Sequence, residues 1–363
     1  MPETPKYLRL LVVRLGAMGD ILHSMPAVTA LRQAHPDWVI GWAIEPQWRG
    51  LFCADGCEPH ASSIHPSAPT ACAPGTPGMP LVDRLHVVPA KQWARSPLKP
   101  TTLWDIRRVR CELRAMRYDV AVDMQGAVRS AMVARWARTR TVFGEAKPRE
   151  FAAKWLFDKK VATQGVHVIE QSLEVANAIL GESLPMTLPL LPRDPAADTK
   201  AAELQQPFVL LSPGAGWGAK RWPADRYGSV AKRIAETGFG VVINSGPAEE
   251  YLAHEIAESS GGAARVLLLD LAELIAVTRR ASLAIAGDTG PLHLACALGK
   301  PVVGIYGPTD PARNGPFHCL NRVLRHPESV RDHSRRSEPE AGLLTITPEA
   351  VTDAALSLLR EAR

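Results

Sequence analysis

One aspartate, Asp20, follows a short aliphatic run and two glycines near the start of the chain. The run covers residues 8–15, Gly16 and Gly19 follow it, and an apolar pattern of helical spacing begins directly afterwards. A carboxylate in this place projects from the carboxyl edge of a strand, where it can act as a general base. Aspartate is also a favoured helix N-cap, so a structural role for the same side chain stays open, and both roles can hold at once.

A glycine-rich segment, residues 212–223, contains the single lysine Lys220 and lies between a predicted strand and a predicted helix. Its three glycines allow the backbone to approach a bulky anion closely, and the lysine can clamp a phosphate. No Gly-Lys-Ser/Thr follows and the glycines occur at every second residue, so the segment is neither a P-loop nor a dinucleotide-binding fingerprint. The alternative is a flexible turn with an exposed lysine.

Polar groups crowd a third turn between strand and helix, Asp288-Thr289-Gly290. The backbone amides of Thr289 and Gly290 at a helix N-terminus predict an anion site, and the threonine hydroxyl adds a donor. His293 lies in the first turn of the same helix and can face the same anion. A single histidine there is more often ordinary packing, but its combination with the polar turn favours the functional interpretation.

The pattern of the whole chain provides the scaffold that such turns need. Strand-like runs alternate with helix-like patterns over residues 1–182 and again over 207–347, with a proline-punctuated linker at 183–206. We therefore predict an α/β protein of two Rossmann-like, doubly wound domains. Because ligands bind at the carboxyl ends of such strands, we expect the domains to face each other across a cleft that takes a nucleotide-linked substrate. The last helix, within 348–363, is predicted to pack back on the N-terminal domain.

Residues 53–80 interrupt the first domain as an irregular insertion that is rich in Pro, Ala, Ser, Cys and Gly. The cysteines and histidines of this segment fit no standard zinc spacing, so an accidental grouping is the better interpretation. Six cysteines in 363 residues do not indicate a disulfide framework. The sequence shows no bilayer-spanning apolar segment and no signal-peptide pattern at its start, which predicts a cytoplasmic protein.

Basic residues gather in the second half of the first domain. Residues 129–160 contain nine Lys or Arg against three acids, although the net charge of the chain is only +5. This patch suggests an anionic partner, while a solvated helical face fits the charge alone equally well. Interleaved aromatic residues of the kind that bind nucleic acids are sparse, so we expect no nucleic-acid partner.

Three segments together resemble glycosyltransferase family 9, the ADP-heptose:lipopolysaccharide heptosyltransferases: Arg14–Pro26, Ala219–Pro223 and Gly287–Asp310. The resemblance covers most of the chain outside 53–80 and 325–345. It implies the GT-B architecture and an inverting transfer of heptose from ADP-heptose to the Kdo or inner core of lipopolysaccharide.

The resemblance also implies roles for individual residues. Asp20 is the base that takes the proton of the acceptor hydroxyl. The leaving diphosphate is bound by cationic and amide groups: Lys220, Thr289, Gly290 and His293. Asp288 contacts the heptose, and Glu249 holds the nucleotide ribose, with its neighbour Glu250 as the alternative. Arg149 contacts the acceptor.

No Asp-x-Asp pair ends a predicted strand in the manner of a metal-dependent nucleotide-sugar site, and cationic groups can replace a metal. We therefore expect no cofactor and no obligate metal. The acceptor that the resemblance implies is a phosphorylated glycolipid of the Kdo-lipid A type. The basic segment 129–160 would meet it in peripheral contact with the cytoplasmic face of the inner membrane.

Several alternatives stay open. Residues 119–130 with Arg149 resemble heptosyltransferase I, whereas residues 219–222 resemble heptosyltransferase II. The donor or acceptor can differ within the family. A non-catalytic nucleotide-sugar-binding protein would keep Lys220 but would not need Asp20, and a nucleotide-sugar epimerase would release a free sugar without a glycolipid acceptor.

Overall fold

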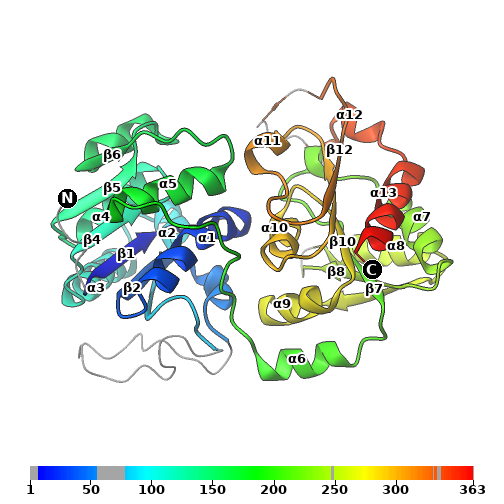
Figure 1. The fold of residues 1–363 in the computed structure, drawn as a ribbon, viewed down its shortest axis with the longest axis horizontal. Helices are drawn as coiled ribbons and strands as arrows, with labels where there is room; N and C mark the ends of the chain where they lie inside the picture. The colour runs from blue at the N-terminus through cyan, green and yellow to red at the C-terminus, as the bar shows by residue number, and fades with distance from the viewer. Residues whose placement is uncertain (1–6, 55–77, 247–248, 330, 333–336, 363) are drawn as a thin grey trace. The chain divides into compact units, whose positions relative to one another are not determined.

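The computed structural model describes residues 7–54, 78–246, 249–329, 331–332 and 337–362. The chain divides into two compact units, Met1–Arg193 and Asp194–Arg363. Each unit is built on a six-stranded parallel sheet with helices on its faces (Figure 1). The predicted α/β class with two Rossmann-like domains is confirmed.

The sheet of the first unit has the strand order β3-β2-β1-β4-β5-β6. Its strands are β1 (Arg9–Val13), β2 (Val39–Ile44), β3 (Arg84–Val87), β4 (Val120–Asp123), β5 (Thr141–Glu145) and β6 (Lys159–Val161). The helices are α1 (Met18–Ala34), η1 (Pro46–Leu51), α2 (Ala90–Arg95), α3 (Pro100–Ala115), α4 (Val128–Trp136), η2 (Phe151–Leu156) and α5 (Val168–Leu180). This is the doubly wound order, in which the direction of winding reverses between β1 and β4.

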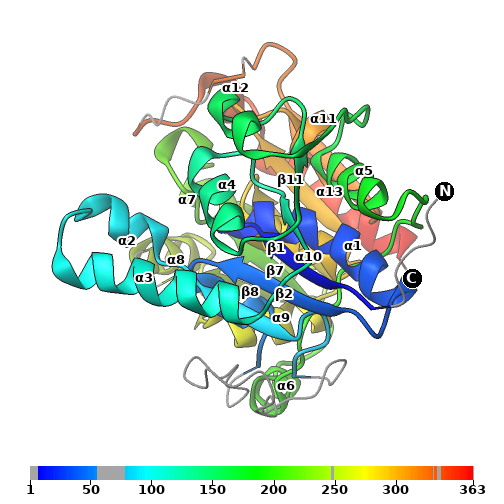
Figure 2. The same cartoon turned by 90° about the vertical axis from the view of Figure 1, so that its left-hand side faces the viewer.

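Strand β1 lies at the centre of this sheet, and its residues Leu10–Val13 are all fully buried. A parallel sheet is covered on both faces, which explains why its central strand is a continuous aliphatic run rather than an alternating one. Leu11 and Val13 pack in one cluster with buried side chains of α3 and α4, while α1 and α5 pack against each other. Figure 2 shows the two helix pairs on either side of β1 and β2.

The sheet of the second unit has the order β12-β11-β10-β7-β8-β9, which repeats the same winding with its reversal between β7 and β10. Its strands are β7 (Phe208–Ser212), β8 (Gly240–Ser245), β9 (Ala264–Leu268), β10 (Leu283–Gly287), β11 (Val302–Tyr306) and β12 (Asn321–Arg325). The helices are α6 (Pro195–Ala202), η3 (Gly218–Lys220), α7 (Ala224–Ala235), α8 (Glu250–Ser259), α9 (Leu271–Arg280), α10 (Gly290–Ala297), α11 (Pro311–Asn314), α12 (Ala341–Leu344) and α13 (Pro348–Glu361).

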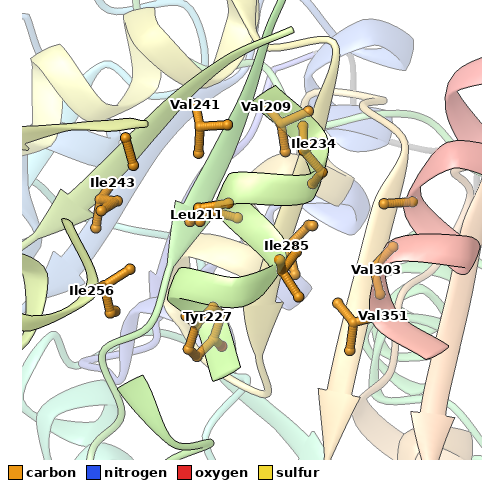
Figure 3. Packing of buried hydrophobic residues seen from close by; sticks show 14 of the residues in the cluster. Val209, Leu211, Tyr227, Ile234, Val241, Ile243, Ile256, Ile285, Val303 and Val351 are labelled. Carbon is orange, nitrogen blue, oxygen red and sulfur yellow. The ribbon is translucent and has the colours of Figure 1, made fainter. Parts of the chain in front are cut away.

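The C-terminal helix α13 belongs to the core of this second unit. Its buried residue Val351 packs in one cluster with Val303 of β11 and with side chains of α7, as Figure 3 shows. The sequence placed this helix on the N-terminal domain instead. The buried side of α13 lies against α7 and strands β10, β11 and β12 because its apolar stripe completes the face that α7 and α8 leave uncovered.

The predicted linker contains helix α6. Asp194 caps this helix by accepting a hydrogen bond from the amide of Ala197 at 2.9 Å, and Pro195 occupies its first turn. Helix α6 packs against α9, and Lys200 pairs with Glu273 at 2.6 Å. The second half of the 183–206 segment is therefore part of the second unit.

Two further sequence expectations concern regions that the structure covers only in part. Of the insertion at 53–80, residues 55–77 lie outside the described residues, whereas Cys53 and Ala54 are buried. Within the described part of the chain, no helix combines the length and the apolar character that a membrane crossing requires.

Candidate functional site

The turn after β1 carries Asp20. Its carboxylate accepts a hydrogen bond from the amide of Ala17 at 3.2 Å through Oδ2, and Oδ1 lies 3.2 Å from Nη2 of Arg14. Asp20 is the third residue of α1, so it supports the helix start through the amide of the preceding cap residue rather than as the cap itself. The side chain is 40% exposed. The structural role therefore exists, and it leaves the carboxylate accessible to a substrate.

A second carboxylate, Asp123, ends the neighbouring strand β4 and is only 1% exposed. Its Oδ1 accepts hydrogen bonds from the amides of Gln125 (2.8 Å) and Gly126 (3.1 Å), and its Oδ2 accepts one from Oγ of Ser130 (2.9 Å). Burial raises the pKa of Asp123 to about 6, against the opposing effect of these donors and of the charge of Arg14. Asp123 was not among the site residues predicted from the sequence.

The Asp123 turn and the Asp20 turn are joined directly. The side-chain carbonyl of Gln125 accepts the amide of Leu15 at 2.8 Å, and Arg14 donates to the carbonyl of Met124. The two turns meet because β1 and β4 are neighbours in the sheet, with Val13 in register with Asp123. Arg14 is thus held at two points, and its guanidinium positions the carboxylate of Asp20.

Arg149 lies in the loop after β5, with an exposed side chain. This loop is fixed to the Asp123 turn, because the amide of Glu150 donates to the carbonyl of Gly126 at 2.8 Å. Gly126 has a φ of +67°, and a Cβ there would meet the backbone nitrogen of Arg149 at 2.9 Å. Glycine is therefore required at 126 both for its conformation and for the close approach of the loop. The predicted base and the predicted acceptor contact are fixed to one central turn.

In the second unit, Lys220 and His293 converge on the buried carboxylate of Asp288. Nζ of Lys220 lies 2.5 Å from Oδ2 and 3.1 Å from the carbonyl of Asp288, and Nε2 of His293 lies 3.1 Å from Oδ1. Burial alone would raise the pKa of Asp288, but the hydrogen bonds and charges of His293 and Lys220 outweigh it and hold the pKa well below its ordinary value. Asp288 is therefore an ionised acceptor at neutral pH.

Thr289 and Gly290 form the start of α10 directly beside this cluster. Thr289 is the N-cap residue, its hydroxyl donates to the carbonyl of Gly287 at 3.3 Å, and Gly290 is the first helical residue. The first amides of a helix attract anions, and the ammonium of Lys220 adds a full positive charge at the same place. Lys220 also lies 4.5 Å from the ring centroid of Trp217. The structure thus brings together five residues that were predicted from two separate segments.

Glu249 faces the glycine-rich turn after β7. Its Oε1 accepts hydrogen bonds from the amide of Ala215 at 3.2 Å and from Nη2 of Arg221 at 3.1 Å. A Cβ at Gly214 would lie 2.1 Å from Oε2, so this glycine makes room for the carboxylate. Glu250, the alternative, is the first residue of α8 and lies 3.6 Å from His254 on its own helix. Of the two carboxylates, Glu249 is the one that contacts the glycine-rich turn, together with Arg221, which was not predicted from the sequence.

Among the residues that the structure describes, no three His, Cys, Asp or Glu side chains converge as a metal site would require. The histidines and the two later cysteines of the insertion fall within 55–77 and so lie outside the described residues.

Comparison with known proteins identifies relatives of this chain. The family model of glycosyltransferase family 9 (heptosyltransferase) matches residues 106–342. Lipopolysaccharide heptosyltransferase 1 of Pseudomonas aeruginosa is 27% identical over 322 residues, which cover 85% of this chain and 81% of the relative. The protein of the same name from Escherichia coli K12 is 28% identical over 341 residues, covering 88% and 94%. The solved structure of E. coli heptosyltransferase WaaC with ADP-2-deoxy-2-fluoro heptose has 25% identity and a TM-score of 0.74, and the match covers 96% of this chain and 99% of that one.

Proposed function

The chain belongs to glycosyltransferase family 9, the heptosyltransferases, and we propose that it transfers a heptose from ADP-heptose to the Kdo or inner core of lipopolysaccharide with inversion at the anomeric carbon. The observation that carries this proposal is the cluster of Lys220, Asp288 and His293 at the first turn of α10. It combines a site for an anion with an ionised hydrogen-bond acceptor. These complement the two parts of a sugar diphosphate, an anionic diphosphate and hydroxyl groups that donate hydrogen bonds. The names of the relatives, which are lipopolysaccharide heptosyltransferases, support the same donor and acceptor.

The first unit supplies the base. An acceptor hydroxyl attacks the anomeric carbon of the donor, the new C–O bond forms as the bond to the ADP oxygen breaks, and Asp20 takes the hydroxyl proton. Arg14 orients the neighbouring carboxylate through an ion pair of 3.2 Å. A base held within hydrogen-bond reach contributes about 10²–10⁴-fold of rate.

The second unit supplies the donor site. The diphosphate gains negative charge as the glycosidic bond breaks, so Lys220 and the first amides of α10 stabilise the transition state more than the bound donor. Asp288 accepts hydrogen bonds from heptose hydroxyls, and His293 holds that carboxylate in place. Glu249 accepts hydrogen bonds from the hydroxyls of the nucleotide ribose.

Neither a cofactor nor an obligate metal is part of this proposal. The charge that a divalent cation would provide to the leaving diphosphate is available from Lys220 and from the amides of Thr289 and Gly290. His293 adds a further positive charge when it is protonated.

We assign the binding of the acceptor to Arg149. Its guanidinium can form charge-assisted hydrogen bonds with an anionic group of a phosphorylated glycolipid of the Kdo-lipid A type. Such a glycolipid is presented by a membrane. We therefore propose a cytoplasmic enzyme in peripheral contact with the inner membrane.

The test is ADP release from ADP-heptose with Kdo-lipid A in buffer that contains EDTA. Wild type should release ADP only when the acceptor is present, and Asp20→Ala should lose the activity while still binding ADP-heptose. Asp37→Ala, which removes an exposed carboxylate of the same unit, is the matched control and should retain it. Donor binding without release by wild type would favour a binding protein, and sugar release that ignores the acceptor would favour an epimerase.

A further inference from the structure

The short helix η2 exposes two aromatic side chains on the surface of the first unit. Phe151 is 68% exposed and Trp155 is 70% exposed. The helix itself is firmly attached, because Ala153 is fully buried in the hydrophobic cluster beneath it and Leu156 packs against the same cluster. Two large apolar rings are therefore exposed to solvent on a helix that is anchored in the hydrophobic core. Neighbouring exposed apolar groups of this size on a folded domain indicate a contact surface.

Two lysine side chains lie close to these rings. Nζ of Lys154 lies 3.4 Å from the ring centroid of Phe151 and 5.1 Å from that of Trp155. Nζ of Lys160 lies 5.8 Å from the ring of Trp155. We call Phe151, Lys154, Trp155 and Lys160 the aromatic-basic surface.

The acidic residues nearest in sequence are engaged in contacts within the protein. Oε2 of Glu150 accepts the amide of Val128 at 2.9 Å. Asp158 pairs with Arg135 at 2.8 Å and accepts the amide of Val142 at 2.8 Å. These contacts direct both carboxylates toward partners on α4 and β5, and Arg135 offsets the charge of Asp158. The aromatic-basic surface therefore keeps an excess of positive charge.

The combination of exposed Trp and Phe with lysines indicates which kind of partner this surface binds: a protein, a nucleic acid or a membrane. Protein interfaces are enriched in aromatic residues but depleted of lysine. Single-stranded nucleic acid needs a basic groove along which successive bases stack. Aromatic rings at the level of the headgroups, with lysines directed at anionic lipids, are the pattern of a peripheral membrane contact. Charge complementarity selects an anionic bilayer as the occupant.

We propose that the aromatic-basic surface docks this protein on an anionic phospholipid bilayer, with Phe151 and Trp155 inserted among the headgroups and the lysines paired with lipid phosphates. The inference deepens the proposed function, on which it rests for its purpose. Arg149 stands two residues before Phe151, so docking here brings the proposed acceptor contact to the membrane that contains the glycolipid. Binding itself requires no transfer reaction.

The experiment is co-sedimentation with vesicles that lack lipopolysaccharide, either phosphatidylcholine alone or phosphatidylcholine with phosphatidylglycerol. Wild type should bind the vesicles with phosphatidylglycerol and lose binding as salt is raised. The double variant Phe151→Ser/Trp155→Ser should bind at least about tenfold more weakly, because two apolar rings no longer enter the interface. The double variant Lys154→Glu/Lys160→Glu should also bind these vesicles more weakly, with the affinity falling about fivefold or more for each lysine replaced.

The matched control is Trp104→Ser on α3, which removes a tryptophan that is 65% exposed in the same unit and should bind as wild type does. Equal losses for Trp104→Ser and the double variant would overturn the proposal, and so would unchanged binding of the double variant. Wild type that binds neither vesicle would also overturn it and would leave a protein partner as the occupant. ADP release with detergent-dispersed acceptor should persist in the double variant, because docking is not needed when the acceptor is dispersed. If wild type released no ADP in this assay but still bound the vesicles with phosphatidylglycerol, the proposed function would be contradicted and the docking surface would not.

Discussion

Lys220 and Asp288 form a largely buried ion pair beyond the carboxyl ends of two neighbouring strands, β7 and β10, with 2.5 Å between Nζ and Oδ2. Lys220 follows β7 and Asp288 follows β10, at the point where the winding of the second sheet reverses. The pair fixes the ammonium beside the first turn of α10, so the lysine charge and the helix amides act on the same anion. One carboxylate thus positions the lysine that we propose binds the diphosphate, and it is the same carboxylate that we propose binds the sugar.

Lys220→Ala should weaken ADP binding by about 10–100-fold, because one charge-assisted contact to the diphosphate is lost. It should also lower the free energy of unfolding by about 1–3 kcal/mol, since Asp288 then keeps only His293 as a charged partner in a buried place. Calorimetric titration with ADP and urea denaturation measure the two effects. Lys200→Ala is the control, because that lysine pairs with Glu273 on the exposed surface. Similar ADP affinities of the two variants would contradict the assignment.

Arg14→Ala should lower kcat by about tenfold or more while the KM for ADP-heptose changes little, because Arg14 orients the base and does not belong to the donor site. Initial rates of ADP release at saturating acceptor provide both constants. Arg140→Ala is a suitable comparison, because this exposed arginine lies at the amino end of β5, at the opposite edge of the sheet from the turns of Asp20 and Asp123. A pure KM effect in Arg14→Ala would mean that Arg14 binds substrate instead of positioning Asp20.

Asp123 should make stability depend on pH. Its pKa in the folded protein is about 6, above the ordinary value of 3.8, so the folded state holds the proton more tightly than the unfolded state. The contribution of this group is complete below pH 3.8 and is lost as pH rises through 6, with a total of about 3 kcal/mol. Asp123→Asn cannot ionise, so its unfolding free energy relative to wild type should rise between pH 4.5 and pH 7.

Urea denaturation at the two pH values measures this difference. Asp37→Asn, an exposed carboxylate of the same unit, provides the control. Parallel pH dependence of wild type and Asp123→Asn would show that the buried carboxyl does not titrate in this range.

The central strand β1 could be predicted from the aliphatic run at residues 8–15, because the central strand of a parallel sheet is buried on both faces and so is continuously aliphatic. The sequence did not predict the edge strands β6 and β12, which are short and contain charged residues that also suit loops. Helix α6 was missed although Asp194-Pro195 is a typical helix start, because the prolines before it indicated a linker.

The site shows a similar division. Each turn could be recognised from its glycines and polar residues, but the partners of the side chains could not. Arg14 contacts a residue that is 110 positions away in sequence, and only the pairing of β1 with β4 brings the two together. Asp123 was overlooked for this reason, since a buried carboxylate with a raised pKa follows from its surroundings and not from its type.

Gly214→Ala should weaken ADP binding without destabilising the fold. A Cβ at this position would lie 2.1 Å from Oε2 of Glu249, and that atom is the end of a flexible side chain that can move away. The displaced carboxylate would lose the amide of Ala215 and the proposed contact with the ribose, which should cost about tenfold in ADP affinity. Gly216→Ala is a matched control two residues later, because a Cβ there meets nothing within 4 Å. Calorimetry with ADP should separate the two alanine variants, and Glu249→Ala should resemble Gly214→Ala. If both glycine variants bind ADP as wild type does, the carboxylate of Glu249 does not hold the nucleotide.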